Sequence, residues 1–394
     1  MSIADPRDLA FESPPVVNPD LRFDASAMNQ SGGIAGNVIF PQQLFVRTVC
    51  VERKRAERSG RRLILMLLRS DSLLRKFPSP ATDRILLAFS RSTRDTDIAG
   101  WYEQGTIIGV LFTEIGAAEL SAAETVSQRV RAALHDAMSD EQLRHIKLSF
   151  YVFPDDCHGQ DPGDRRSISV MYPDVLNELD SKRTALIVKR CLDVLGSLAL
   201  LVLLSPLLLL IACAIKLTSR GPVVFRQKRL GQFGRGFTFL KFRSMYTNAG
   251  HSMHKEYVKQ FIANQSDSNE NSSGPKLYKL KGDPRVTKLG AFLRRTSLDE
   301  LPQLFNVVAG QMSLVGPRPP LPYEFESYAT WHKSRLLGVK PGITGFWQVH
   351  GRSRVKFDEM VRMDLQYARA WSLWLDIKIL LRTPLAVFTG NGAY

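Results

Sequence analysis

The feature that most constrains this chain is an uncharged, mostly aliphatic stretch in its middle, VLGSLALLVLLSPLLLLIACAI at residues 194–215. As a helix it would be about 33 Å long at roughly 1.5 Å per residue, which is enough to cross a bilayer. A buried helix of a soluble domain explains the stretch poorly, because it has no polar face. The sequence therefore predicts a membrane-embedded segment with polar protein on both sides of it.

Two details speak against a simple crossing of the membrane. Ser205 and Pro206 lie at the centre of the stretch, where proline removes an amide donor and bends a helix, and serine can bond to a freed carbonyl. Basic residues flank both ends, so the positive-inside rule gives the two ends the same preference. These residues are Lys182, Arg183, Lys189 and Arg190 before the stretch and Lys216 and Arg220 after it. A re-entrant hairpin over 190–217 satisfies both details, and a straight spanning helix with a tolerated kink is the alternative.

The net charge limits the class of binding partner, and the cysteine spacing indicates the redox compartment. A formal net charge of +15 predicts an anionic partner, and nucleic acid, acidic lipid and phosphorylated substrates all qualify. The four cysteines show no CxxC pairing, which suits a reducing compartment and argues against a zinc site. The first residues lack the basic-then-apolar pattern of a secretory signal, so we expect that nothing exports the first half of the chain.

The part before the membrane stretch is predicted to be a separate domain. Residues 1–40 are rich in Pro, Asn, Ser and Gly without periodicity, and we expect a disordered arm. Between 41 and 155, a basic helix precedes strand and helix patterns in the order βαββαβ, the ferredoxin-like arrangement. Residues 156–180 are expected to form a linker. The chain is thus predicted to be an α+β protein whose second domain covers 181–394.

The order βαββαβ, with ERKRAERSGRRLILMLLRSD leading into it, resembles the GGDEF or nucleotide-cyclase-like family. Arg69 stands where that family uses a metal-binding acid. In place of the family's glycine-rich acidic hairpin, this chain has Glu103, Gln104, Gly105, Thr106 and Ile107. The resemblance therefore implies a degenerate domain, without metal or triphosphate chemistry, that serves dimerisation, regulation or partner docking. A generic α/β sandwich of unrelated ancestry is the alternative.

An acid pair in the second half raises the question of chemistry. Asp299 and Glu300 lie in LRRTSLDELPQLFNVV, at 293–308. A capping box from Ser297 to Glu300 fits the S-x-x-E rule, but Pro302 weakens it, so an N-cap at Asp299 fits better. Capping does not explain the arginines of this half, which are Arg294, Arg295, Arg318 and Arg352. Two carboxylates with guanidinium partners are the composition that phosphoryl transfer through an acyl phosphate needs.

A series of motifs then follows in order: KRCLDVLGSLALLVLLSPLLLLIA, GPVVFRQKRLG, FLKFRSM, RRTSLDELPQLFNVVAGQMSLVGPRP, VKPGITGFWQVHGRS and LDIKILLRTPLAVFTGNGAY. With these motifs the region 185–394 closely resembles the bacterial sugar transferases, the monotopic polyprenyl-phosphate phosphoglycosyl transferases. The resemblance implies an α/β catalytic domain that transfers a sugar-1-phosphate from a UDP-sugar to undecaprenyl phosphate and releases UMP. It implies a covalent aspartyl-phosphosugar intermediate, a Mg²⁺ cofactor, and a place as first membrane step of exopolysaccharide, O-antigen or capsule synthesis.

The resemblance also implies roles for particular residues. Asp299 would be the nucleophile and Glu300 would bind Mg²⁺. Arg318 would hold the nucleotide, and Arg294 and Arg352 would clamp phosphate oxygens with their planar guanidinium groups.

Weaker candidates come from two further motifs. Lys241 and Arg243 of the KFR motif would bind substrate, although basic residues near a membrane can also meet lipid headgroups only. Ser205 and Pro206 match the helix-breaking pair of the family's re-entrant helix, in agreement with the argument from flanking charges.

The implied partners are a UDP-sugar, undecaprenyl phosphate and membrane lipid. Glucose or galactose is favoured because the ending GNGAY resembles exopolysaccharide-initiating members. We expect no nucleic-acid partner, since no such module is recognised, and a homodimer stays open. The expected location is the cytoplasmic face of the bacterial inner membrane, held monotopically. The alternative function is a membrane-tethered, non-catalytic signalling protein that binds a cyclic dinucleotide.

The C-terminal segment 363–381 leaves two interpretations open. Trp371, Trp374, Ile377 and Leu381 recur at helical spacing, which is typical of an interfacial helix with aromatic anchors but also of a helix that packs into the domain. The histidines show no metal-ligand spacing and are expected to be structural or surface residues.

Overall fold

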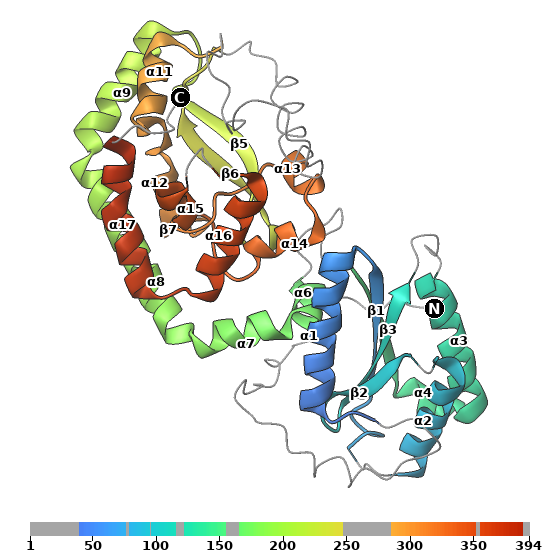
Figure 1. The fold of residues 1–394 in the computed structure, drawn as a ribbon. Helices are drawn as coiled ribbons and strands as arrows, with labels where there is room; N and C mark the ends of the chain where they lie inside the picture. The colour runs from blue at the N-terminus through green and yellow to red at the C-terminus, as the bar shows by residue number, and fades with distance from the viewer. Residues whose placement is uncertain are drawn as a thin grey trace. The chain divides into compact units, whose positions relative to one another are not determined.

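The computed structural model describes residues 39–75, 79–94, 96–115, 122–154, 165–246, 285–351 and 355–388. The chain divides into two compact units, Met1–Ser181 and Lys182–Tyr394, both drawn in Figure 1. The predicted disordered arm lies outside the described residues except for its last two positions.

The N-terminal unit is built on a four-stranded antiparallel sheet. Its strands lie in the order β2-β3-β1-β4. Along the chain the elements are α1 (Gln42–Ser59), β1 (Arg62–Arg69), α2 (Pro80–Ser92), β2 (Ile98–Glu103), β3 (Ile107–Ile115), α3 (Ala122–Ala137), α4 (Asp140–Arg144) and β4 (Lys147–Phe153). This confirms the predicted βαββαβ order, to which the structure adds the short helix α4.

Helices cover both faces of this sheet, with α1 on one side and α2 and α3 on the other (Figure 1). The central strand β1 therefore reads RLILMLLR, with no polar alternation between its ends. Ile64 and Met66 belong to a core that includes buried side chains of α2 and α3. On the opposite face, the Phe45 ring of α1 lies only 2.4 Å from where a Cβ of Gly109 would stand. A glycine is therefore required at this point of β3.

The expected linker at 156–180 needs correction. Over its second half the structure has two helices, α6 (Arg165–Met171) and α7 (Pro173–Ser181). Tyr172 between them is buried, and the Arg53 guanidinium of α1 lies 3.8 Å from the centre of its ring. Arg53 also pairs with Asp174 at 2.9 Å. The segment is folded onto α1 because it buries apolar surface and supplies the carboxylate that a buried arginine needs. Residues 155–164 lie outside the described residues.

The C-terminal unit begins with two consecutive helices, α8 (Arg183–Leu203) and α9 (Ser205–Thr218). They meet at Leu204 with a bend of 63°. In the described part of the chain no single helix is long and apolar enough to span a membrane, whereas this bent pair has the length and composition together. The Ser205 hydroxyl donates to the Val202 carbonyl at 2.8 Å, so serine does bond to a carbonyl at the break, as the sequence predicted.

The rest of the unit mixes short strands and helices. An antiparallel hairpin, β5–β6, and a parallel pair, β7–β8, are its only sheets among the described residues. The elements are β5 (Val224–Leu230), η2 (Gln232–Gly234), β6 (Gly236–Phe242), α11 (Lys288–Arg295), η3 (Leu298–Glu300), α12 (Gln303–Val308), β7 (Ser313–Val315), α13 (Pro322–Glu326), α14 (Thr330–Lys333), η4 (Ser334–Leu336), β8 (Gly342–Thr344), α15 (Phe346–His350), α16 (Phe357–Arg369) and α17 (Leu373–Phe388).

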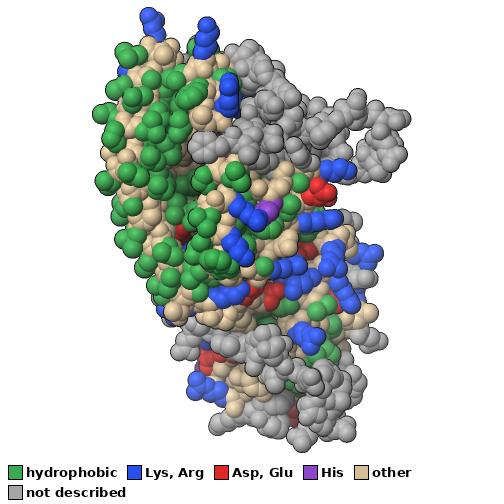
Figure 2. Space-filling model, turned by 60° about the vertical axis from the view of Figure 1, so that its left-hand side comes forward, with side chains coloured by type: hydrophobic (Ala, Val, Ile, Leu, Met, Phe, Trp, Pro, Cys, Tyr) green, Lys and Arg blue, Asp and Glu red, His purple; other side chains and the backbone are tan. Residues whose placement is uncertain are grey.

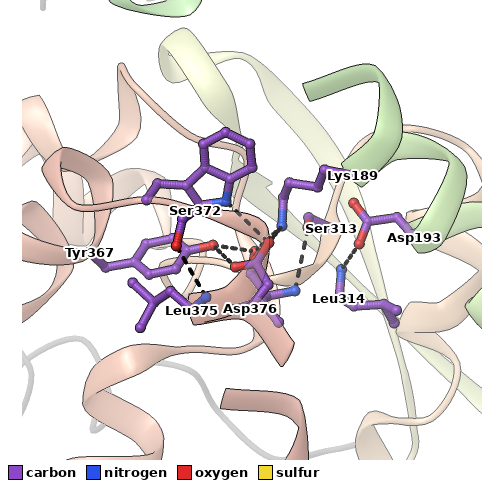
Figure 3. Close-up of polar contacts among 10 residues, drawn as sticks. Lys189, Asp193, Ser313, Leu314, Tyr367, Ser372, Leu375 and Asp376 are labelled. Carbon is purple, nitrogen blue, oxygen red and sulfur yellow. Dashed lines mark hydrogen bonds and ion pairs between the residues drawn. The ribbon is translucent and has the colours of Figure 1, made fainter. Parts of the chain in front are cut away.

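A buried polar network attaches α8 to this unit (Figure 3). Lys189 of α8 donates to the Asp376 carboxylate of α17 and to the Val315 carbonyl of β7. Asp376 also accepts from the Tyr367 hydroxyl at 2.6 Å and from the Trp371 indole at 3.1 Å. One turn after Lys189, the Asp193 carboxylate accepts from the Leu314 amide at 3.0 Å. The polar side of α8 therefore faces protein.

Because α8 buries its polar side, its apolar side is turned outward. Hydrophobic side chains gather over one side of the molecule in Figure 2. The exposed large ones include Leu195, Val202 and Leu203 of α8, Leu209, Leu210 and Leu217 of α9, and Trp374, Leu381 and Leu385 of α17. An exposed apolar surface of this extent is typical of a site that binds a membrane or another protein.

The C-terminal aromatic segment packs into the domain on one side, while its interpretation as an interfacial helix stays a prediction. Trp371 is only 6% exposed and packs into the domain, whereas Trp374 is 60% exposed and Leu381 is 72% exposed. Lys378 lies 5.4 Å from the centre of the Trp374 ring. One side of α17 packs inward through Ile379 and the other presents apolar surface.

Candidate active site

The acid pair lies in a tight turn between two helices. α11 is N-capped by Thr287, whose hydroxyl accepts from the Gly290 amide at 2.9 Å. After α11, Ser297 takes a left-handed backbone with φ 57°, and Asp299 and Glu300 follow in the 3₁₀ turn η3. α12 begins at Gln303 with Pro302 as its N-cap residue, so Asp299 is not the cap of that helix. Ser297 makes no side-chain capping bond either, so neither capping interpretation is correct.

Asp299 and Glu300 differ in their surroundings. Asp299 is 8% exposed, so its carboxylate is held inside the site. Glu300 is more accessible and pairs with the Arg318 guanidinium at 3.2 Å. Both side chains of this pair are 21% exposed, which leaves the charges open to water and to a ligand. The turn thus presents one buried carboxylate and one carboxylate that is already held by a predicted nucleotide-binding arginine.

Lys241 lies near both Asp299 and several arginines of the site. In the β5–β6 hairpin it lies opposite Phe225, with its ammonium 5.2 Å from the centre of that ring. The pKa of Lys241 is lowered to about 8, first of all because the ammonium is removed from water. Charges near it act in both directions: Asp299 raises the pKa, and Arg229, Arg318 and Arg294 lower it. Three other predicted site residues, Asp299, Arg318 and Arg294, therefore lie within electrostatic reach of Lys241.

Arg243 of the KFR motif has a different environment from Lys241. It is 5% exposed, and its Nη2 donates to the carbonyl and the hydroxyl of Ser219, both at 2.8 Å. This nitrogen secures the chain at the end of α9, while Nε and Nη1 make no hydrogen bond within the described residues, so a role in binding substrate stays a prediction. Arg352 lies outside the described residues.

Arg229 is a member of the site that the sequence did not reveal. It lies on the same face of the hairpin as Phe225 and Lys241, because side chains alternate along a strand and opposed residues share a face. Its guanidinium lies 4.4 Å from the centre of the Phe239 ring and donates to the Pro319 carbonyl at 2.6 Å. The register of the β5–β6 hairpin places Arg229 on the same face as Lys241. The sequence alone does not give this register, because it is set by the turn at 231–235.

The donor set of the acid pair can be tested against the implied Mg²⁺. In the part of the chain that the structure describes, no three His, Cys, Asp or Glu side chains form a metal cluster. Mg²⁺ is usually bound through one or two carboxylates together with substrate phosphates, not by an all-protein cage. Glu300, whose side chain is 21% exposed, supplies one such carboxylate beside Asp299. The residues therefore fit Mg²⁺ that is shared with a bound diphosphate.

Comparison with known proteins gives a match over the C-terminal unit. The family model described as bacterial sugar transferase matches residues 184–390. Undecaprenyl-phosphate galactose phosphotransferase of Salmonella typhimurium is 42% identical over 228 residues, which is 58% of this chain and 46% of that protein. Undecaprenyl-phosphate glucose phosphotransferase of Komagataeibacter xylinus is 41% identical over 264 residues, 61% of this chain and 44% of that protein. The chain thus spans less than half the length of these two relatives.

A shorter relative is covered almost completely. Exopolysaccharide production protein ExoY of Rhizobium meliloti is 41% identical over 206 residues, which is 52% of this chain and 88% of that protein.

The resemblance of the chain to solved structures is weak. A DGC protein from Thermotoga maritima has 12% identity and a TM-score of 0.23, and covers 31% of this chain and 86% of that chain. The GGDEF domain of DgcB from Caulobacter crescentus has 17% identity and a TM-score of 0.25, and covers 41% of this chain and 93% of that chain. Scores this low carry no argument, so the degenerate GGDEF-like domain at 41–155 stays a prediction.

Proposed function

The chain belongs to the bacterial sugar transferase family, and from this premise we propose that it transfers a sugar-1-phosphate from a UDP-sugar to undecaprenyl phosphate. The observation that carries the proposal is the gathering of Asp299, Glu300, Lys241, Arg294 and Arg318 in one site. A buried carboxylate beside several cations is suited to attack on a diphosphate, whose charge the cations offset. Galactose and glucose, the sugars in the names of two relatives, are the first donors to test.

The proposed reaction has two displacements at phosphorus. In the first, an Asp299 oxygen bonds to the sugar-proximal phosphorus, the diphosphate P–O bond breaks, and UMP leaves with the bonding electrons. In the second, a phosphate oxygen of undecaprenyl phosphate attacks the same phosphorus and releases the Asp299 carboxylate. The product is undecaprenyl diphosphate carrying the sugar. The reaction would be the first membrane step in the assembly of an exopolysaccharide, O-antigen or capsule.

The cationic residues of the site would offset the negative charge of the diphosphate. Lys241 is positioned to neutralise phosphate oxygens beside Asp299, and Arg294 adds a guanidinium from the preceding helix. Arg318, which pairs with Glu300, would bind the donor diphosphate. Mg²⁺, held by Glu300 together with the substrate, would supply charge neutralisation for the departing UMP.

We propose that the apolar side formed by α8, α9 and α17 lies in the cytoplasmic leaflet of the inner membrane. The bend of 63° at Ser205 and Pro206 and the basic residues at both ends support a re-entrant hairpin over 190–217. The site would then meet a lipid phosphate at the interface. In a variant without the natural cysteines, Ser181→Cys and Arg220→Cys should react with an impermeant maleimide from the same side of the membrane. Labelling from opposite sides would exclude the hairpin.

The reaction is tested by UMP release from the detergent-solubilised, full-length protein. Each reaction contains UDP-glucose or UDP-galactose together with undecaprenyl phosphate and Mg²⁺. Separate reactions leave out the donor, the undecaprenyl phosphate or the Mg²⁺ in turn. We expect release with one donor that falls to background in Asp299→Asn. Asp136→Asn, which removes an exposed carboxylate of α3, is the matched control and should keep the full rate. Release that survives Asp299→Asn would refute the covalent mechanism, and folded protein that releases no UMP would refute the proposed activity.

A further inference from the structure

The segment that carries Arg318 is held in an unusual way. Its sequence, GPRPP at 316–320, contains three prolines, which have no amide donor. The Gly316 amide donates to the Thr344 carbonyl at 2.9 Å, and the residues that follow are held mainly through their carbonyl groups. Each of the four carbonyls from 317 to 320 accepts a hydrogen bond from a distant part of the unit. The donors are the Gly342 amide to Pro317 at 2.9 Å, Arg335 Nη2 to Arg318 at 2.6 Å, Arg229 Nη1 to Pro319 at 2.6 Å, and the Leu230 amide to Pro320 at 3.0 Å.

The bond to the Arg318 carbonyl comes from a buried charge. Arg335, in η4, is 2% exposed and is one of the largest fully buried side chains in the described part of the protein. Its Nε lies 3.5 Å from the Asp364 carboxylate of α16, a residue that is itself 1% exposed. Its guanidinium also lies 5.9 Å from the centre of the Tyr328 ring. A guanidinium can reach a carboxylate and a carbonyl at once because its donors form a rigid fork.

Burial excludes a direct role in binding substrate. A side chain that is 2% exposed and directed at a main-chain carbonyl cannot contact a diphosphate that Arg318 approaches from the solvent side. What Arg335 can determine is the orientation of the Arg318 main chain. That orientation sets where the Arg318 guanidinium meets Glu300.

We propose that Arg335 is a positioning residue for Arg318, and that Asp364 holds Arg335 for this purpose. The inference rests on the proposed function, because it treats Arg318 as the group that meets the donor diphosphate. Arg335 acts through the carbonyl of Arg318 and takes no part in the chemistry. The consequence is that a change at Arg335 should alter donor binding only when Arg318 is present.

A double-mutant cycle tests this dependence. The variants Arg335→Lys, Arg318→Ala and the double variant are compared with wild type in the KM for the UDP-sugar and in the Kd for UMP by calorimetry. Arg335→Lys keeps the charge near Asp364 but loses the fork. We expect it to raise the KM and Kd about tenfold, the scale of one lost charge-assisted hydrogen bond, with a smaller change in kcat. In the Arg318→Ala background the same substitution should change them less than about twofold.

The controls separate positioning from general loss of structure. Arg53→Lys removes the fork of a buried arginine in the N-terminal unit and should leave donor binding unchanged. If Arg335→Lys does not fold, Asp364→Asn replaces it in the same cycle. If the fold-changes in KM and Kd of the two single variants multiply in the double variant, the inference is overturned. Turnover by the wild type would still uphold the proposed reaction. Wild-type protein that binds UMP but releases none would refute the reaction, and the calorimetric cycle would still decide the role of Arg335.

Discussion

The Lys189–Asp376 pair that attaches α8 to the domain should dominate the stability of the C-terminal unit. Asp376 accepts from Lys189, Tyr367 and Trp371, and all four side chains are buried (Figure 3). Asp376→Asn keeps the size of the side chain but removes the negative charge. Lys189 is then left as a buried cation without a counter-charge.

The size of the effect follows from this geometry. Breaking a buried ion pair by removing one partner costs about 3–5 kcal/mol. For a unit of this length each kcal/mol lowers Tm by roughly 2–4 °C, so we expect the unfolding transition of the C-terminal unit to fall by roughly 6–20 °C. The double variant Lys189→Met with Asp376→Asn should be more stable than Asp376→Asn alone, because no unpaired charge remains.

Differential scanning calorimetry in detergent measures both transitions of the full-length protein. The transition of the N-terminal unit serves as an internal control, since it contains neither residue. Asp358→Asn, which removes a carboxylate paired with His332 at the surface of α16, is the matched variant and should shift Tm only slightly. A shift below roughly 2 °C for Asp376→Asn would refute the reasoning, since it would show that the pair does not anchor α8.

Three further predictions concern other parts of the molecule. Because the pKa of Lys241 is about 8, its ammonium loses its charge above about pH 8, and the KM for the donor should then rise in the wild type. The KM should not rise in Lys241→Arg, and steady-state UMP release at varied pH measures both. Burial raises the pKa of Asp364 to about 7, more than the charge of Arg335 lowers it. Its folded-state pKa therefore exceeds its unfolded value, so the stability of the C-terminal unit should fall as pH rises from about 4 to about 7, and Asp364→Asn should flatten this slope in thermal melts. Gly109→Ala should destabilise the N-terminal unit by about 1–3 kcal/mol in urea unfolding, because the new methyl group meets the Phe45 ring.

The sequence predicted those elements whose physical signal is local. Strands β1 to β4 were found because their apolar runs are bounded by turn residues, and the break at Ser205 and Pro206 because proline cannot continue a helix without a bend. Asp299 and Lys241 were found through motifs, and the structure brings them together.

Other features depend on long-range contacts that the sequence does not display. The sequence predicts a linker where the helices α6 and α7 lie, because only Arg53, more than a hundred residues earlier, shows why that segment must fold back. The bonds from Arg243 to Ser219 at the end of α9 are likewise not visible in the KFR motif. Arg229 and Arg335 were missed for the same reason, since their acceptors are main-chain carbonyls of a distant proline-rich segment.

The helix that we propose for the membrane, α8, and the proposed phosphate-binding site belong to one compact unit. On α8, Lys189 and Asp193 bind β7 and α17, while Arg190 donates to the carbonyls of Val307 and Val308 at 2.7 and 2.9 Å. Those carbonyls end α12, the helix that follows the Asp299 turn directly. The depth of α8 in a bilayer would therefore fix the height of the Asp299 carboxylate above it. With α8 in the bilayer as proposed, Asp299 would meet a lipid phosphate at the interface without a separate movement of either partner.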